Sequence, residues 1–302
     1  MNNAIAPTIG LHARPISGAA LRGLAPILAF FAMAYALAWG LWLVVAATAD
    51  AAGVGTNAFL VMIETQQFEV APPIPGWLLY GITRVIDFAF SIVGVVVIAA
   101  TAGTAGLREL ARRLVAWRFG VGWYRLALLP VALYALSTAF AGAAPAVSFD
   151  RAVVALASLE AGLLVSLFLR GAMGEELGLR GFALPWLQER MSPFRASLVI
   201  GLGWRLWHLP VLMTREPFAT GLFLVLAIGL SFLFTLMFNG TGGSLIPGLL
   251  FHATQNWDEG FETLFPRLAG TSWETPSTIA LLLIGLGAGV ILWIRRRDGG
   301  RE

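Results

Sequence analysis

The chain has 302 residues, of which 58% are hydrophobic and 12% are charged. With a mean hydropathy of +0.79, this balance excludes an ordinary soluble domain and indicates a polytopic membrane protein. The absence of cysteine excludes disulfides, thiolate metal sites and cysteine nucleophiles.

Apolar stretches predict about eight transmembrane helices, because most of them approach the ~20 residues needed to cross ~30 Å of hydrocarbon. The expected spans are 24–48, 77–103, 124–145, 152–174, 196–213, 218–238, 244–258 and 277–294. We therefore expect an all-α fold with a single membrane domain over 24–294. A flexible cytoplasmic arm, 1–23, precedes this domain, and a basic cytoplasmic tail, 295–302, follows it.

The charged residues predict the orientation of the chain, because short cytoplasmic loops are enriched in Lys and Arg. Every basic residue is Arg, and on the eight-helix topology most of them fall on one side. The opposite side receives Arg151, Arg215 and Arg267 together with many acidic residues. Both termini are therefore expected in the cytoplasm, and the protein in the cytoplasmic membrane if its source is bacterial. The net charge of +3 then reflects orientation in the lipid, and no nucleic-acid partner is expected.

Three polar segments lie outside this simple pattern. The longest outer connection, 49–76, has room for a short interfacial helix. The segment 106–118 has apolar residues at helical spacing, so it is either an amphipathic helix on the lipid surface or a basic loop that enforces the topology. On the second expected helix, Arg84 and Asp87 are three residues apart and most simply neutralise each other.

Glu175 and Glu176 stand side by side at the end of the fourth apolar stretch, where carboxylates are costly. Neighbouring residues on a helix diverge by about 100°, so the two side chains face different directions, whereas Glu176 and Arg180 lie one turn apart. This spacing predicts a buried Glu176–Arg180 ion pair and leaves Glu175 facing a cavity, as a general base would. The alternative is that both acids are solvated at the cytoplasmic interface.

Two of the three histidines, His208 and His252, lie inside apolar segments. His208 follows Trp204 by one turn and precedes a proline that ends or kinks its helix. His252 and Asn256 are four residues apart, so an imidazole and an amide share one helix face. That pair suits a proton donor beside a group that stabilises an oxyanion. The plainer interpretation is that each histidine only bonds a neighbouring helix.

Two histidines and a glutamate are also the ligand set of a catalytic zinc site, so Glu175, His208 and His252 are candidate ligands of a divalent metal. The sequence contains no His-Glu-x-x-His motif, and spacing alone does not bring the three side chains together. Metal-dependent and metal-free sites therefore both stay open at this point.

Three motifs occur in a fixed order along the chain: Glu175-Glu176-x-x-x-Arg180, Trp204-x-x-x-His208 and His252-x-x-x-Asn256. In this order and at these separations they resemble the motifs of the CPBP intramembrane proteases. That family groups type II CAAX prenyl proteases with bacteriocin-processing and immunity proteins, and is also called the abortive-infection family. The motif core covers roughly 150–260. In one departure, Trp204 stands where the family usually has Phe.

The resemblance implies that Glu175 activates the hydrolytic water, while His208 and His252 position that water and shuttle protons. Asn256 would support the oxyanion. Family members are disputed between metal-dependent and glutamate-dependent chemistry, so a zinc ion stays an open expectation.

Glu176 and Arg180 are expected, from the same resemblance, to hold the site together or to grip a terminal carboxylate of the substrate. The leading hypothesis is an intramembrane endopeptidase that cuts a membrane-associated or lipid-anchored, CAAX-like peptide near its cytoplasmic end. Its partners would be membrane lipid and a peptide or lipidated protein substrate. The alternative from another class is a non-catalytic membrane immunity or scaffold protein of the same fold.

Overall fold

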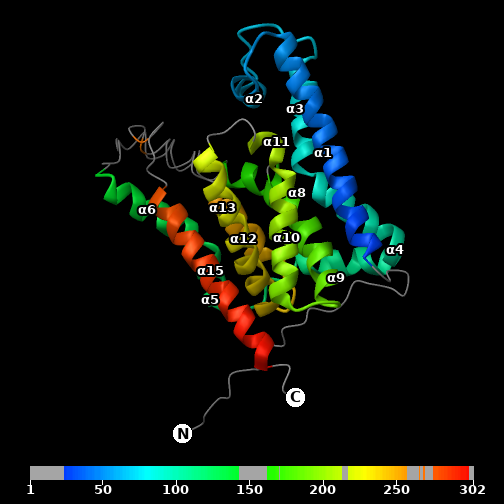
Figure 1. The fold of residues 1–302 in the computed structure, drawn as a ribbon, viewed down its shortest axis with the longest axis vertical. Coiled ribbons are helices and arrows are strands. Elements are labelled where there is room, and N and C mark those ends of the chain that lie inside the picture. Colours follow the sequence, from blue (N-terminus) through cyan, green and yellow to red (C-terminus); the bar gives the residue numbers. More distant parts are fainter. Residues whose placement is uncertain are drawn as a thin grey trace.

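The computed structural model describes residues 24–142, 162–169, 171–212, 217–256, 265, 268 and 275–298, and these residues form helices joined by short connections, with no strand among them. In chain order the elements are α1 (Ala25–Ala51), α2 (Thr56–Thr65), α3 (Gly76–Asp87), α4 (Ala89–Leu114), α5 (Val121–Ala127), α6 (Leu129–Phe140), α8 (Gly171–Glu176), the π-helix η1 (Leu177–Ala183), α9 (Leu184–Gln188), α10 (Pro193–Trp207), α11 (Leu209–Leu212), α12 (Pro217–Gly240), α13 (Ile246–Gln255) and α15 (Thr275–Asp298) (Figure 1). The predicted all-α class is confirmed for this part of the chain. The expected arm, 1–23, lies outside the described residues.

Three of the described helices are long and apolar enough to cross a membrane: α1, α4 and α15. The pair α5 and α6, bent by 45°, makes a fourth if it forms one span. These helices mark an integral membrane protein. The count of eight spans and the cytoplasmic location of the termini stay predictions.

The helices that carry the motifs are shorter than the predicted spans. Of the stretch expected at 152–174, residues 152–161 and 170 lie outside the described residues, and helical structure runs through 171–188. The stretch expected at 196–213 divides into α10 and α11 at His208. The polar motif residues lie on the buried faces of these short helices, whereas α10 exposes Leu202 and Leu206 on its outer face.

Contacts between helices fix their relative directions. In α10 and α12, Ser197 Oγ donates to Thr235 Oγ1 at 2.7 Å and Ser231 Oγ donates to the Ser197 carbonyl at 2.8 Å. Nearer the other end of the pair, Gly201 faces Ile228, so these two helices are antiparallel. The end of α10 therefore lies far from the end of α12.

Helix α15 runs parallel to α12. Gly285 lies against Gly229, and Gly289, one turn further along, lies against Phe232, one turn further along α12. The close approach of two glycines brings these helix backbones together. The C-terminal end of α15 therefore lies at the same end of the bundle as Gly240.

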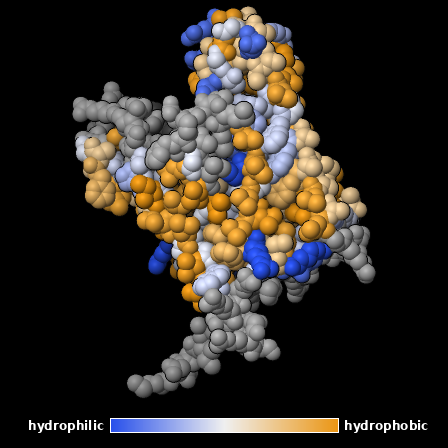
Figure 2. Space-filling model, viewed as in Figure 1, coloured by the Kyte–Doolittle hydropathy of each residue, from blue (hydrophilic) through white to orange (hydrophobic). Residues whose placement is uncertain are grey.

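The end of α4 and the start of α13 meet at this same end. The Leu245 backbone N–H donates to the Arg113 carbonyl at 3.0 Å, and Ser244 Oγ donates to the Ala116 carbonyl at 2.6 Å. We call this end the arginine-rich end, because the exposed arginines on the elements that meet there include Arg108, Arg112, Arg118, Arg190, Arg195 and Arg295. Figure 2 shows hydrophilic groups below a broad hydrophobic band in the same view.

Helix α4 is broken at Gly103, whose φ of 56° and ψ of −149° are not helical. Glycine tolerates this backbone because it lacks a Cβ. Residues after the break form a helix, as expected for an amphipathic segment, but Arg113 does not point outward. Its side chain is fully buried, pairs with Glu109 at 3.0 Å and donates to the Gly181 carbonyl at 3.2 Å. This arginine is a structural link between α4 and η1.

A short helix, α2, lies in the predicted connection 49–76. Phe59 and Ile63 of α2 pack with Val45 and Ala49 of α1 and Leu79 of α3 in a small apolar cluster, separate from the main core. This cluster lies at the opposite end of the bundle from the arginine-rich end (Figure 1). It holds α2 beside the site described next.

Candidate active site

The first motif is held against the start of α4 by close backbone packing. Ser91 Oγ donates to the Met173 carbonyl at 2.6 Å. A Cβ at Gly174 would collide with the Asp87 backbone, and a Cβ at Gly178 would collide with the Phe90 carbonyl. These missing side chains let α8 and η1 approach α4, which fixes the position of the two glutamates between them.

Glu176 lies at the centre of a buried polar cluster. Its Oε1 accepts a hydrogen bond from Arg180 at 2.9 Å and lies 2.9 Å from Nδ1 of His252. The side chains of the three residues are at most 2% exposed. The predicted Glu176–Arg180 ion pair is present, and His252 joins it from α13. Because a carboxylate only accepts, Nδ1 of His252 carries the proton, and in a neutral ring Nε2 is then an acceptor.

Two aromatic rings also face the guanidinium of Arg180. Its Cζ lies 4.3 Å from the centre of the Phe234 ring and 5.1 Å from that of Trp204. Such contacts stabilise a desolvated cation. Arg180 is therefore a buried cation whose charge is balanced by Glu176. Its two expected roles stay predictions.

Glu175 points away from Glu176, as neighbouring helical residues do. Its side chain accepts a hydrogen bond from Nε1 of Trp204. Trp204 also lies 5.6 Å from the His252 ring, between ring centres. The aromatic residue of the second motif thus contacts both the first and the third motif.

Three motif side chains converge on one face of Gly171. A Cβ at that position would lie 2.7 Å from Oε1 of Glu175, 3.2 Å from Nε2 of His252 and 3.3 Å from Nδ2 of Asn256. Two acceptors and one donor therefore border the space that the glycine leaves. This set matches the hydrogen-bonding capacity of a water molecule, which donates twice and accepts twice.

His208 belongs to the wall of the same site. A cavity of about 380 Å³ is lined by Glu175, His208, Asn256 and Gly171. His208 Nδ1 lies 2.9 Å from the Trp204 carbonyl, and its ring packs edge-on against Trp207. Trp39 of α1 donates to the Trp207 carbonyl at 3.0 Å, which anchors this end of α10.

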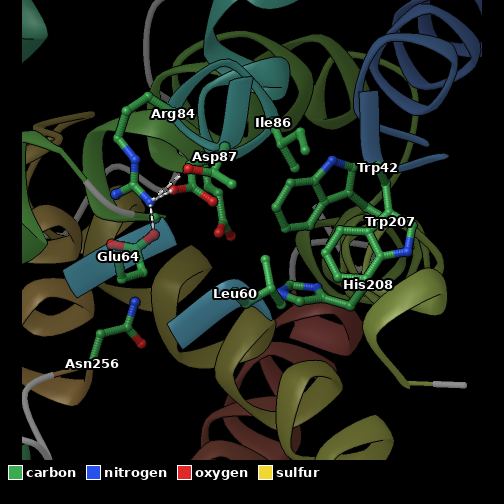
Figure 3. Close-up of a pocket in the computed structure, with 12 residues that line it drawn as sticks. Trp42, Leu60, Glu64, Arg84, Ile86, Asp87, Trp207, His208 and Asn256 are labelled. Atoms are coloured by element: carbon green, nitrogen blue, oxygen red, sulfur yellow. Dashed lines mark hydrogen bonds and ion pairs between the residues drawn. The ribbon is translucent and has the colours of Figure 1, made fainter. Parts of the chain in front are cut away.

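The remaining walls of the cavity include α2 and α3, which the motifs do not contain. Arg84 bonds Glu64 of α2, lies 3.2 Å from Asp87 and donates to the Leu169 carbonyl at 2.9 Å. Figure 3 shows this ionic group across the cavity from Trp42, Trp207 and His208. The predicted Arg84–Asp87 pair is present, but sequence reasoning missed Glu64. Its place in a long acidic connection carried no periodic signal.

The metal hypothesis finds no support in the arrangement of donors. Among the described residues, no group of three or more His, Asp or Glu side chains is placed to hold a metal ion. Glu175 bonds Trp204, and His252 bonds Glu176. The donors as arranged do not fit a zinc ion, so we derive no step through a metal.

Comparison with known proteins adds evidence at this point. Residues 157–257 match the family model described as type II CAAX prenyl endopeptidase Rce1-like, and all seven motif residues fall inside this range. A 57-residue segment is 42% identical to "CAAX prenyl protease 2" of Methanococcus maripaludis. That segment is 19% of this chain and spans about a fifth, 21%, of the relative. Over the region of its three motifs, the chain is therefore similar to the type II CAAX prenyl endopeptidases of the Rce1-like family.

Proposed function

We propose that the protein is an intramembrane endopeptidase that hydrolyses a peptide bond with a water activated by Glu175. The observation that carries this proposal is the convergence of Oε1 of Glu175, Nε2 of His252 and Nδ2 of Asn256 beside Gly171. A general base, a second proton acceptor and an amide donor surround one water-sized space. A hydrolase needs these groups to activate a water molecule and to stabilise an oxyanion.

In this mechanism, the bound water donates one hydrogen bond to Glu175 and the other to His252. Its oxygen attacks the carbonyl carbon of the substrate as Glu175 takes a proton, and the C–N bond still holds. The Asn256 amide then donates to the oxyanion of the tetrahedral intermediate. When the C–N bond breaks, the proton held by Glu175 passes to the leaving nitrogen, with His208 as a shuttle at the cavity wall. One water is consumed, and an acid and an amine are produced.

Glu176 and Arg180 have a positioning role in this proposal. The Glu176 carboxylate holds the proton of His252 on Nδ1, so that Nε2 faces the water as an acceptor. Arg180 neutralises Glu176 inside the apolar core. Both residues act through His252 and do not touch the substrate.

The substrate class follows from the family and from the location of the site. We infer a membrane-associated or lipid-anchored peptide, of the kind that the family description and the name of the relative indicate. The finer topology belongs to the same proposal: eight membrane segments, with the arginine-rich end and both termini in the cytoplasm. In a bacterium the protein would then reside in the cytoplasmic membrane.

The test compares the wild-type protein with Glu175→Gln in membranes of one host. New N-terminal peptides are mapped by mass spectrometry in each. We expect cleavage products that depend on Glu175, with equal amounts of folded protein in both samples. Identical peptide maps would contradict the peptidase and favour a role that needs only the fold. Metal analysis of the purified protein addresses zinc separately, since one bound equivalent that Glu175→Gln or His252→Ala removes would require a metal-dependent form of the reaction.

A further inference from the structure

The cavity of the site opens at the end of the bundle opposite the arginine-rich end. Leu60 and Glu64 of α2, with Thr83, Arg84 and Asp87 of α3, line it on this side. Helix α2 sits at this end with the C-terminal end of α1. Elements outside the three motifs therefore form the mouth of the site.

The depth of the site does not by itself select one side of the membrane. Counting ~1.5 Å per residue, His208 lies ~20 Å along α10 from its start at Pro193, and Asn256 lies ~15 Å along α13 from Ile246. Both starts belong to the arginine-rich end. In a hydrocarbon layer of ~30 Å the site is thus near mid-depth. The side from which a substrate can enter therefore depends on which residues block the path from the site to each membrane face.

Packed side chains block the path from the cavity to the arginine-rich end. Glu176, Arg180 and His252 form a buried layer next to the cavity. Beyond them toward that end, Phe182 and Met237 are 1% and 0% exposed. A substrate entering from this end would have to displace the ion pair and the core behind it.

Toward the opposite end no such layer exists among the described residues. The ionic group of Arg84, Glu64 and Asp87 is partly exposed, with side-chain exposures of 15%, 30% and 27%. The connection that carries α2 also exposes Asp50 and Glu69. An acidic connection of this kind is typical of the side that the positive-inside bias disfavours for arginine.

We propose that the substrate reaches Glu175 past α2, from the membrane face opposite the arginine-rich end. With that end in the cytoplasm, the peptide bond that is cut lies at mid-depth or in the outer half of the bilayer. This inference rests on the proposed function for the cutting step, and it reverses the cytoplasmic side of cleavage expected from the sequence. The substrate is then a membrane peptide or lipidated segment presented on the outer side.

The absence of native cysteine allows a direct test with single-cysteine variants of the full chain. Leu60→Cys reports on the cavity, and Val61→Cys, 62% exposed on the same helix but not lining the cavity, is its matched control. Val115→Cys, 69% exposed after α4, reports on the arginine-rich end. A membrane-impermeant maleimide is applied to intact bacterial cells and, separately, to inside-out vesicles.

We expect Leu60→Cys and Val61→Cys to react in intact cells and Val115→Cys to react in inside-out vesicles alone. Reaction of Leu60→Cys from the same side as Val115→Cys would overturn the proposal. These labelling results do not require activity, so they stay informative if Glu175→Gln leaves the peptide map unchanged. If cleavage products are found, cut sites located in cytoplasmic segments of the host proteins would also overturn it.

Discussion

Gly171 is the residue on which the catalytic geometry depends most directly. A single added methyl group would lie 2.7 Å from Oε1 of Glu175 and 3.2 Å from Nε2 of His252. We expect Gly171→Ala to lower the cleavage rate by about 100-fold or more, because the Glu175 carboxylate must move and the water space is filled. The fold should persist, since the end of a side chain can shift.

The matched control for this variant is Gly81→Ala. Gly81 lies within α3, and nothing is within 4 Å of a Cβ built there. It should keep full activity and gain up to about 1 kcal/mol of stability from the loss of glycine flexibility. Equal activity of Gly171→Ala and Gly81→Ala, in the peptide-mapping assay, would mean that the space beside Gly171 is not used.

Glu175 and Glu176 are neighbours in sequence, but we expect substitution by glutamine to have opposite effects on thermal stability at the two positions. Glu176→Gln leaves the buried Arg180 charge without its partner, and breaking such a pair costs about 3–5 kcal/mol. Glu175→Gln removes a carboxylate whose hydrogen bond comes from the neutral indole of Trp204, so the thermal stability of this variant should equal or exceed that of the wild type. Melting curves in one detergent compare the two variants. A melting temperature of Glu176→Gln equal to that of Glu175→Gln would contradict the assignment of Glu176 to structure.

Trp204 gives a test at a position where the chain departs from the pattern of the family that it resembles. Trp204→Phe keeps a ring beside Arg180 but removes the Nε1–H that bonds Glu175. Hydrogen bonds to charged groups are worth about 1.5–3 kcal/mol, which corresponds to about 10- to 100-fold in rate. Cleavage by Trp204→Phe should therefore fall within this range while the melting temperature stays close to that of the wild type. Unchanged cleavage would show that the indole N–H does not position Glu175.

At the residue scale the sequence predicted local pairs and missed distant ones. The Glu176–Arg180 and Arg84–Asp87 pairs follow from spacing on one helix. The Glu176–His252 bond joins residues 76 positions apart, and Arg84–Glu64 joins two helices through a connection. Neither leaves a periodic signal. The role of Gly171 depends on where Asn256 and His252 lie, which spacing along the chain does not give.

Among the elements, the crossing of η1 and α4 holds the first motif in place. A Cβ at Gly178 would collide with the Phe90 carbonyl, and one at Gly94 would lie 2.8 Å from the Gly178 Cα. Gly178→Ala forces two backbones apart, so we expect a loss of about 1–3 kcal/mol of stability and a displaced Glu175. The control is Gly40→Ala on α1, where nothing lies within 4 Å. A melting temperature of Gly178→Ala equal to that of Gly40→Ala would refute this role.

Element boundaries were predicted well where helices are long and apolar. The spans expected at 24–48, 218–238 and 277–294 correspond to α1, α12 and α15 within a few residues. The second expected span, 77–103, divides at Phe88 into α3 and α4, and the π-helix within 171–188 was not anticipated. Hydropathy records whether a segment can lie in lipid, whereas these breaks arise from packing around the polar site.

For the whole molecule, the structure predicts a gradient of local stability. Within η1, Gly178 through Ala183 are buried, whereas α2 contributes only Phe59 and Ile63 to a small separate cluster. Local opening costs least where few apolar contacts are lost. In hydrogen–deuterium exchange in lipid nanodiscs, α2 should therefore exchange early, while η1 and α13 should exchange last. Since lipid also shields amides, the fair comparison is with the apolar middle of α15, where Leu283 and Val290 are exposed on one face. Exchange in η1 as fast as in α2, with α15 protected, would mean that protection follows contact with lipid and not packing around the site.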